Sequence, residues 1–248
     1  MSIICNFSGI YDLYIMKKQE ECLFIDMKDI KGTCGYCSDE ALRTIRDRFS
    51  EFSAYDVHFI DNGNYHYLTR LWTEKLDEKF DLAVFDHHTD MQQSAFGDIL
   101  SCGSWILHVL DDENIKCNKI ILIGPPEASL KYIGNVFHDR LICIAEEDIE
   151  NFLSENNEAY LEISNSKLPL YISIDKDLIS KNEFVSNWDQ GNLSTKQITE
   201  IIKNLSRGRK IIGADICGEP DINFSSIQIN KSKIINEKLE SVLASLHI

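Results

Sequence analysis

Short apolar segments alternate along the chain with stretches in which apolar residues recur every three or four positions. A short apolar segment rich in Ile, Val and Phe is typical of a buried β-strand, and the longer spacing is typical of a helix that buries one face. Because strands that alternate with helices form βαβ units, the pattern predicts an α/β fold with a mostly parallel central sheet. The predicted strands are residues 22–27, 56–60, 81–86, 119–124, 140–145, 168–175 and 210–215.

Three of the predicted helices carry further signals. Ser38 is an N-cap residue ahead of apolar positions 42, 45 and 49, and Ser194 with Gln197 forms a capping-box pattern. Residues 219–232, after the last strand, are predicted to form a loop. The helix that follows has an apolar face made of Ile234, Ile235, Leu239, Val242, Leu243 and Leu246. With 248 residues in all, we expect a single domain over residues 1–248.

Acidic and imidazole side chains gather where predicted strands end. Asp86, His88 and Asp90 follow the strand 81–86, and alternation along an extended segment points all three to one side, with His87 facing away. A second pair of acids, at positions 175 and 177, follows the strand 168–175. Further polar clusters at 61–66 and 215–219 follow two other strands. Ligands bind at the carboxyl ends of parallel strands, and carboxylates with imidazole suit a divalent metal.

The order of these clusters resembles the ureohydrolase superfamily of arginase, agmatinase and formiminoglutamase over residues 56–220. That family carries G-G-D-H, D-A-H-x-D, S-x-D-x-D and D-I-x-E motifs. Here residues 63–66 keep the first glycine and the histidine, 86–90 and 173–177 match well, and 215–219 place the glutamate one residue late. The resemblance implies a three-layer α/β/α fold and a binuclear metal hydrolase of linear amidines that cleaves a guanidino C–N bond.

The resemblance also implies the metal ligands. One metal is expected on His66, Asp86, Asp90 and Asp175, and the other on Asp86, His88, Asp175 and Asp177. Four carboxylates then balance two divalent ions, and unpaired buried carboxylates would be very costly. Two Mn²⁺ ions are expected, while Ni²⁺, Fe²⁺ and Zn²⁺ also accept these donors. Two metals that share a water lower its pKa and supply a hydroxide nucleophile.

Three residues are predicted to handle the substrate. Glu219 is expected to grip a cationic group and, with Asp90, to act in catalysis, because a carboxylate forms a forked pair with guanidinium. Trp188 and Asp189, on the loop after the third motif, are expected to hold the same group through cation–π and charge contacts. The alternatives are a loop acid at 219 and a packed tryptophan at 188.

Departures from the family pattern leave two rival functions open. Cys102 stands where many ureohydrolases carry a proton-shuttle histidine, and the head-group segments of arginases are missing, which weakens free arginine as a substrate. One rival is a deacetylase-like amide hydrolase with one Zn²⁺. The other is a metal-binding, non-catalytic homologue. The lone pair Cys34 and Cys37 is interpreted as structural.

Charge and composition narrow the partners. The net charge of −15 argues against nucleic acid and anionic membranes and suits a small cationic guanidino compound or an arginine-containing peptide. No apolar run is long enough to predict a membrane span, and the N-terminus lacks a signal-peptide layout. Eight scattered cysteines without a disulfide framework fit the cytoplasm. The oligomeric state is not set by the sequence, and a homo-oligomer stays open.

Overall fold

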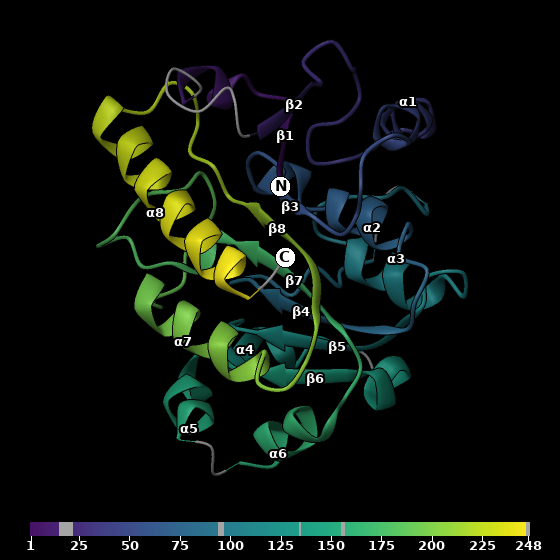
Figure 1. The fold of residues 1–248 in the computed structure, drawn as a ribbon, viewed down its shortest axis with the longest axis vertical. Helices are drawn as coiled ribbons and strands as arrows, with labels where there is room; N and C mark the ends of the chain where they lie inside the picture. Colours follow the sequence, from purple (N-terminus) through teal and green to yellow (C-terminus); the bar gives the residue numbers. More distant parts are fainter. Residues whose placement is uncertain (15–21, 94–96, 134, 155–156, 247–248) are drawn as a thin grey trace.

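A single parallel sheet forms the centre of the structure, a computed structural model that describes residues 1–14, 22–93, 97–133, 135–154 and 157–246 (Figure 1). All strand pairs are parallel, in the order β2-β1-β3-β8-β7-β4-β5-β6. The strands are β1 (Ser2–Asn6), β2 (Cys22–Asp26), β3 (Val57–Phe59), β4 (Phe80–Phe85), β5 (Cys117–Ile123), β6 (Leu141–Ile144), β7 (Leu170–Asp175) and β8 (Ile211–Cys217). The predicted α/β class is confirmed, with one additional strand.

That additional strand is β1. Its five residues are too few and too mixed in polarity to stand out in the sequence, yet they pair with β2 on one side and with β3 on the other. Pairing with two neighbours satisfies the backbone groups of a segment that has little strand signal of its own.

Helices cover both faces of the sheet, as Figure 1 shows. Side chains alternate across β4, so that Leu82 and Val84 enter one apolar core and Ala83 and Phe85 enter the other. The first core also contains residues of α1, α2 and α3, and the second contains residues of α5, α6, α7 and α8. The helices are α1 (Asp39–Phe49), α2 (Leu68–Thr73), α3 (Trp105–Asp111), α4 (Glu127–Leu130), α5 (Ile149–Leu153), α6 (Glu158–Asn165), α7 (Thr195–Leu205) and α8 (Ser226–Ser245). This is the predicted three-layer arrangement.

The predicted caps form. Ser38 accepts a hydrogen bond from the Ala41 amide at the start of α1, and Ser194 and Gln197 make a reciprocal capping box at α7. The predicted loop 219–232 is wrong in its second half, because α8 already begins at Ser226 with Ser225 as its cap. Residues 226–232 are largely polar and Ile227 is exposed, so this part of α8 lacks the apolar periodicity that marks the rest of the helix.

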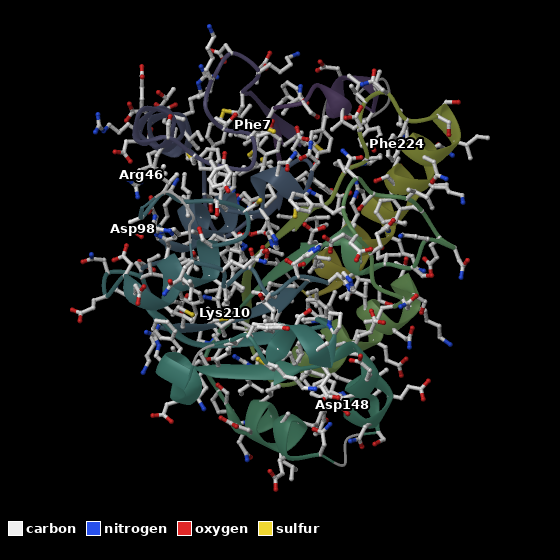
Figure 2. The ribbon with its side chains drawn as sticks, turned by 180° about the vertical axis from the view of Figure 1, so that it is seen from behind. Phe7, Arg46, Asp98, Asp148, Lys210 and Phe224 are labelled. Atoms are coloured by element: carbon white, nitrogen blue, oxygen red, sulfur yellow. The ribbon has the colours of Figure 1, made fainter. Side chains whose placement is uncertain are left out.

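Charged side chains project outward around the domain, as at Arg46, Asp98 and Asp148 in Figure 2. In the described part of the chain, no helix combines the length and the apolar character that crossing a bilayer requires.

Candidate metal centre

Four neighbouring strands bring the predicted polar clusters to one place. β3, β8, β7 and β4 are adjacent in the sheet and parallel, so their carboxyl ends lie at the same edge. The segments after them are 61–66, 215–219, 175–177 and 86–90. Because ligands of parallel α/β sheets bind at this edge, the strand order creates a site from residues that lie far apart in the chain.

The first group of side chains surrounds His66. Its Nδ1 lies 3.1 Å from Asp86 Oδ2, 3.0 Å from Asp90 Oδ2 and 3.7 Å from Asp175 Oδ2. All four side chains are buried. They are the four residues that the family resemblance implied as ligands of one metal.

The second group surrounds His88. Its Nδ1 lies 2.9 Å from Asp177 Oδ2 and 3.5 Å from Asp86 Oδ1. Asp86 thus directs one oxygen to each group, as a bridging carboxylate does. Asp177 is buried, whereas His88 is partly open to solvent.

Local hydrogen bonds hold the acids in place. The His88 amide donates to Asp86 Oδ1 at 2.6 Å, and the Asp177 amide donates to Asp175 Oδ1 at 2.9 Å. Asp90 adopts a left-handed backbone, with φ at 48°, and accepts a 2.6 Å hydrogen bond from Trp105 Nε1. Sequence reasoning missed this tryptophan, because its role depends on the approach of α3 to the loop after β4.

A hydrogen-bonded chain orients His66. Its Nε2 lies 2.9 Å from Ser173 Oγ, and Ser173 donates to Asp215 Oδ1 at 2.6 Å. Because Ser173 gives its own proton to Asp215, its oxygen accepts the proton of Nε2 and leaves Nδ1 with a lone pair. Asp215, also bound by Thr69, therefore supports the cluster and is not part of it.

The Nδ1 atom of His66 marks the position that a cation would take. It is buried and, within the described part of the chain, has no hydrogen-bond partner although three carboxylates surround it. A buried nitrogen that faces carboxylate oxygens needs a positive charge between them, which a proton or a metal ion supplies. The donor set of imidazole and carboxylates therefore fits a divalent metal.

Electrostatics support the same conclusion. Burial and the charge of Asp86 raise the pKa of Asp90 to about 7. Burial, and then the charges of neighbouring aspartates, also raise the pKa of Asp175 and lift that of Asp177 well above its ordinary value. The pKa of His88 is raised to about 12, since hydrogen bonds with Asp177 and Asp86 outweigh burial, which lowers it. Carboxylates that repel one another in a buried site are stabilised by divalent cations.

A cavity of about 380 Å³ opens onto both groups. Trp188 lies on its lining beside His88, with the ring centroids 5.6 Å apart, and Cys102 is a half-buried lining residue. A Cβ on Gly63 would lie 2.9 Å from Trp188 Cδ1 and 3.1 Å from Asp175 Oδ2. This close approach explains why the motif 63–66 keeps its first glycine.

The whole region that holds these groups matches one protein family. Residues 4–220 match the model of the arginase family. The chain belongs to the arginase family.

Individual proteins are similar to this arginase-family chain in sequence or in fold. A Thermotoga maritima protein described only as uncharacterized is 30% identical over 254 residues, which cover 99% of this chain and 94% of its own. The formimidoylglutamase of Bacillus subtilis has a TM-score of 0.70 at 15% identity and covers 99% of this chain and 86% of its own. Trypanosoma cruzi formiminoglutamase, solved with Mn²⁺, has a TM-score of 0.67 at 10% identity. The match covers 97% of this chain and 93% of the formiminoglutamase chain. At such identities the two structures establish the fold alone.

Glu219, a predicted substrate-binding residue of this arginase-family chain, does not line the cavity that opens onto the metal-ligand groups. Glu219 is buried, and all four lone-pair positions of its carboxylate are occupied. Lys176 Nζ lies 2.8 Å from Oε1, which also accepts from Asn236 Nδ2 at 2.6 Å, and Tyr14 and Ser232 donate to Oε2 at 2.7 and 2.8 Å. The expectation that Glu219 grips a substrate is thereby corrected, because its carboxylate faces α8 and not the cavity.

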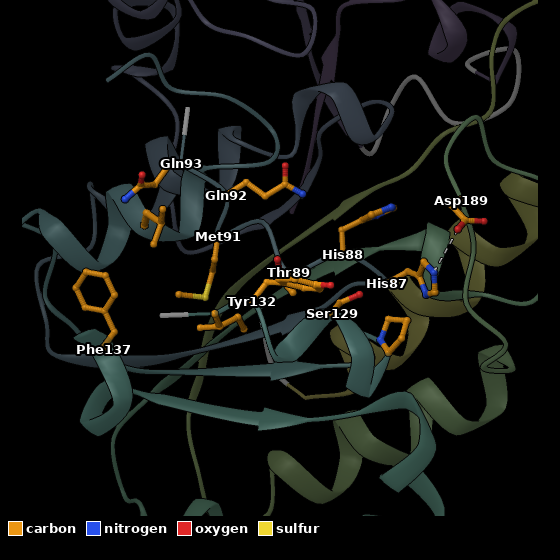
Figure 3. Close-up of a pocket in the computed structure, with 13 residues that line it drawn as sticks. His87, His88, Thr89, Met91, Gln92, Gln93, Ser129, Tyr132, Phe137 and Asp189 are labelled. Atoms are coloured by element: carbon orange, nitrogen blue, oxygen red, sulfur yellow. Dashed lines mark ion pairs between the residues drawn. The ribbon is translucent and has the colours of Figure 1, made fainter. Parts of the chain in front are cut away.

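Asp189 and His87 lie at a second cavity, of about 740 Å³ (Figure 3). His87 faces away from the metal-ligand groups, as predicted, with Nε2 3.9 Å from Asp189 Oδ2. Asp189 is exposed and stands at the edge of this cavity. The apolar part of the lining includes Met91, Leu107, Ile133 and Phe137. His88 lines both cavities, so the second cavity adjoins the first.

Proposed function

We propose that this chain is a binuclear metal hydrolase that cleaves a C–N bond in a guanidino compound or a related linear amidine. The observation that carries the proposal is the pair of His–Asp groups around His66 and His88, which share Asp86. The ligand atoms of His66, Asp86 and Asp90 lie within 4.8 Å of one another, and so do those of Asp86, His88 and Asp177. Membership of the arginase family supports the same class of reaction.

In this proposal His66, Asp86, Asp90 and Asp175 hold one Mn²⁺, and Asp86, His88, Asp175 and Asp177 hold the other. The buried, partnerless Nδ1 of His66 supports the first assignment. Two such ions supply a bound water with a pKa near neutral. The chain's own residues hold the ligands in place: Trp105 fixes Asp90, and the Ser173–Asp215 pair fixes the ring of His66.

The substrate would enter the cavity beside Trp188, whose ring face suits a guanidinium or ammonium group. Because Glu219 is fully engaged, the charge of such a substrate would meet Asp189 and the acidic cluster itself. The adjoining apolar cavity would take the remainder of the molecule, either a small guanidino compound or an arginine side chain in a peptide. A cytoplasmic location is part of the proposal, supported by eight cysteines that are scattered along the chain without the spacing of a disulfide framework.

A non-catalytic, metal-binding homologue is the second candidate. Cys102 in place of a shuttle histidine and Gly218 at the family's glutamate position favour it. The deacetylase-like rival with one Zn²⁺ is less well supported, because each of the two groups has its own imidazole.

The test is a release assay for urea and ammonia across guanidino and formimino compounds, with Mn²⁺-loaded protein and parallel metal analysis. We expect two ions per chain and turnover of at least one cationic substrate. Two bound ions without turnover of any compound would favour the non-catalytic homologue. One tightly bound Zn²⁺ with cleavage of neutral acyl-lysine amides would overturn the proposal.

A further inference from the structure

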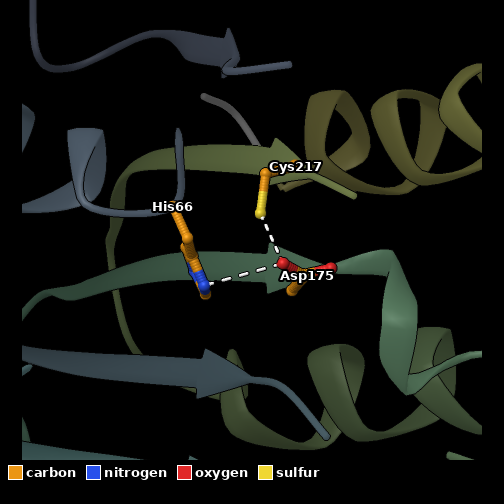
Figure 4. A group of neighbouring side chains, drawn as sticks. All are labelled: His66, Asp175 and Cys217. Carbon is orange, nitrogen blue, oxygen red and sulfur yellow. Dashed lines mark hydrogen bonds and ion pairs between the residues drawn. The ribbon is translucent and has the colours of Figure 1, made fainter. Parts of the chain in front are cut away.

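A sulfur atom lies next to the ligand set implied by the family resemblance. Cys217 is the last residue of β8 and is fully buried. Its Sγ lies 2.9 Å from Asp175 Oδ2. Figure 4 shows the two side chains pointing toward each other from neighbouring strands. Asp175 and Cys217 are partners in the register between β7 and β8, so the sheet itself holds the two side chains next to each other.

The same sulfur belongs to a group that includes His66. A ring nitrogen of His66, an Asp175 oxygen and Cys217 Sγ all lie within 4.8 Å of one another. Metal–ligand distances are about 2.0–2.3 Å for nitrogen, oxygen and sulfur, so atoms about 3–4 Å apart can share one ion. The separations from Asp175 Oδ2, 2.9 Å to Cys217 Sγ and 3.7 Å to His66 Nδ1, are of this size.

The backbone beside Cys217 is held rigidly. Gly218 has φ at 83°, and a Cβ there would lie 2.4 Å from Asp175 Oδ1 and 2.7 Å from the Lys176 amide nitrogen. Only glycine allows this approach. The glycine that replaces the family's glutamate therefore lets the end of β8 lie against Asp175, with the thiol beside the carboxylate.

We propose that the Cys217 thiolate is a ligand of the metal that His66 holds, which gives this position nitrogen, oxygen and sulfur donors. The inference rests on the binuclear centre proposed above. On binding, the S–H bond is exchanged for a sulfur–metal bond and one proton leaves to solvent. Because thiolate favours softer ions, this position would prefer Zn²⁺ or Co²⁺ to Mn²⁺. The position around His88, with carboxylate and imidazole donors and no sulfur, would suit Mn²⁺.

Cobalt substitution tests the sulfur ligand directly. Chelator-treated protein is titrated with Co²⁺, and the near-ultraviolet sulfur-to-cobalt charge-transfer band is recorded with the bound stoichiometry. We expect the band in the parent, its loss in Cys217→Ser, and its persistence in Cys102→Ser and Cys34→Ser, two controls whose cysteines line the cavity that opens onto the candidate ligands. Two bound Co²⁺ ions in the parent without the band would overturn the inference and leave the binuclear proposal standing.

Competition between metals gives a second readout that needs no activity. In Cys217→Ser we expect the preference for Zn²⁺ over Mn²⁺ at one of the two positions to fall by more than about tenfold, since even groups that only orient ligands are worth about 10–100-fold. If Cys217 merely donates a hydrogen bond to Asp175, serine replaces it and the preference stays unchanged, which would refute the sulfur ligand. Failure of the parent to bind any metal would refute the binuclear centre and the sulfur ligand together.

Discussion

At the scale of single residues, the candidate centre depends on groups that never touch a metal. The Nε2 of His66 is held by Ser173, and Ser173 by Asp215, so that Nδ1 presents a lone pair to the acids. A side chain that sets the tautomer of a ligand contributes to metal affinity, and its removal typically lowers that affinity by about 10–100-fold.

Ser173→Ala removes this orientation. We expect metal affinity to fall by about 10–100-fold, with the fold retained, because the imidazole loses the acceptor that fixes its tautomer. Isothermal titration with Mn²⁺ measures the change. Thr73→Val is the control, since it also removes a buried hydroxyl, one bound only to carbonyls of its own helix. Equal metal affinity in Ser173→Ala and the parent would contradict the proposal that Ser173 and Asp215 orient the His66 ring for metal binding.

Cys102 is the second residue that invites a test. Burial, and then the charge of Asp90, raise the pKa of its thiol to about 12, so the thiol stays protonated at neutral pH. We expect Cys102→Ser to change turnover by less than about tenfold, whereas removal of a general acid–base group costs about 10²–10⁴-fold. Steady-state kinetics with metal analysis measure this. A hundredfold loss at full metal occupancy would show that the thiol transfers protons.

At the scale of elements, α8 is anchored to the sheet by a buried ion pair. Lys176, just after β7, and Glu219, just after β8, are both fully buried, and Ser232 and Asn236 of α8 complete their hydrogen bonds. Such a pair adds little net stability when intact, but removal of one partner leaves an uncompensated buried charge.

Lys176→Met therefore tests the anchor. We expect the free energy of unfolding to fall by about 3–5 kcal/mol, because Glu219 is left buried without its cation. Lys210→Met, which breaks the exposed pair with Glu78, is the matched control and is expected to cost less than about 1 kcal/mol. Urea denaturation measures both. A Lys176→Met variant as stable as the control would show that the pair is dispensable.

The packing of β3 against β8 and α2 makes stability depend on pH. His58 is fully buried, stacks on Trp72 with ring centroids 3.9 Å apart, and lies 2.9 Å from Ser53 O and 3.0 Å from Ala214 O. Burial lowers its pKa from 6.5 to about 4. Between these values the unfolded chain binds a proton that the folded chain does not, so stability is present above pH 6.5 and falls as the pH drops toward 4.

We expect roughly 3 kcal/mol of stability to be lost across this window through His58. The measurement is the difference in unfolding free energy between the parent and His58→Gln, taken with chelator at pH 7 and at pH 4.5. Because pH 4.5 lies above the folded pKa, the dependence on pH in His58→Gln is expected to be shallower by about 2.4 kcal/mol between these two pH values. Parallel curves for the two proteins would assign the acid sensitivity to other groups.

At the scale of the whole molecule, the acidic centre links folding to metal. Without a cation, burial and mutual repulsion raise the pKa values of Asp90, Asp175 and Asp177, which marks the site as a local source of instability. A ligand that binds only the folded state adds stability in proportion to the logarithm of its concentration above Kd.

Asp175→Asn separates these two effects. In chelator we expect the variant to melt no lower than the parent, because one repelling buried charge is gone. With Mn²⁺ at 100 times the Kd of the parent, we expect about 2.7 kcal/mol of added stability for each bound ion in the parent and little in the variant. Thermal melts with and without metal measure both. Equal stabilisation of the two proteins would remove Asp175 from the ligand set.

What the sequence determined about this protein is local. The acids and histidine at 86–90 and the acids at 175–177 follow apolar strands at short range, and Ser38 and Ser194 cap helices within one turn, so spacing alone predicts them.

Only the tertiary structure decided which strand ends meet. The order β3-β8-β7-β4 depends on contacts between residues far apart in the chain. That order turns Glu219 toward Lys176 and α8, and it places Cys217 beside Asp175, because partners across a sheet follow from strand order and register and not from neighbours in the chain.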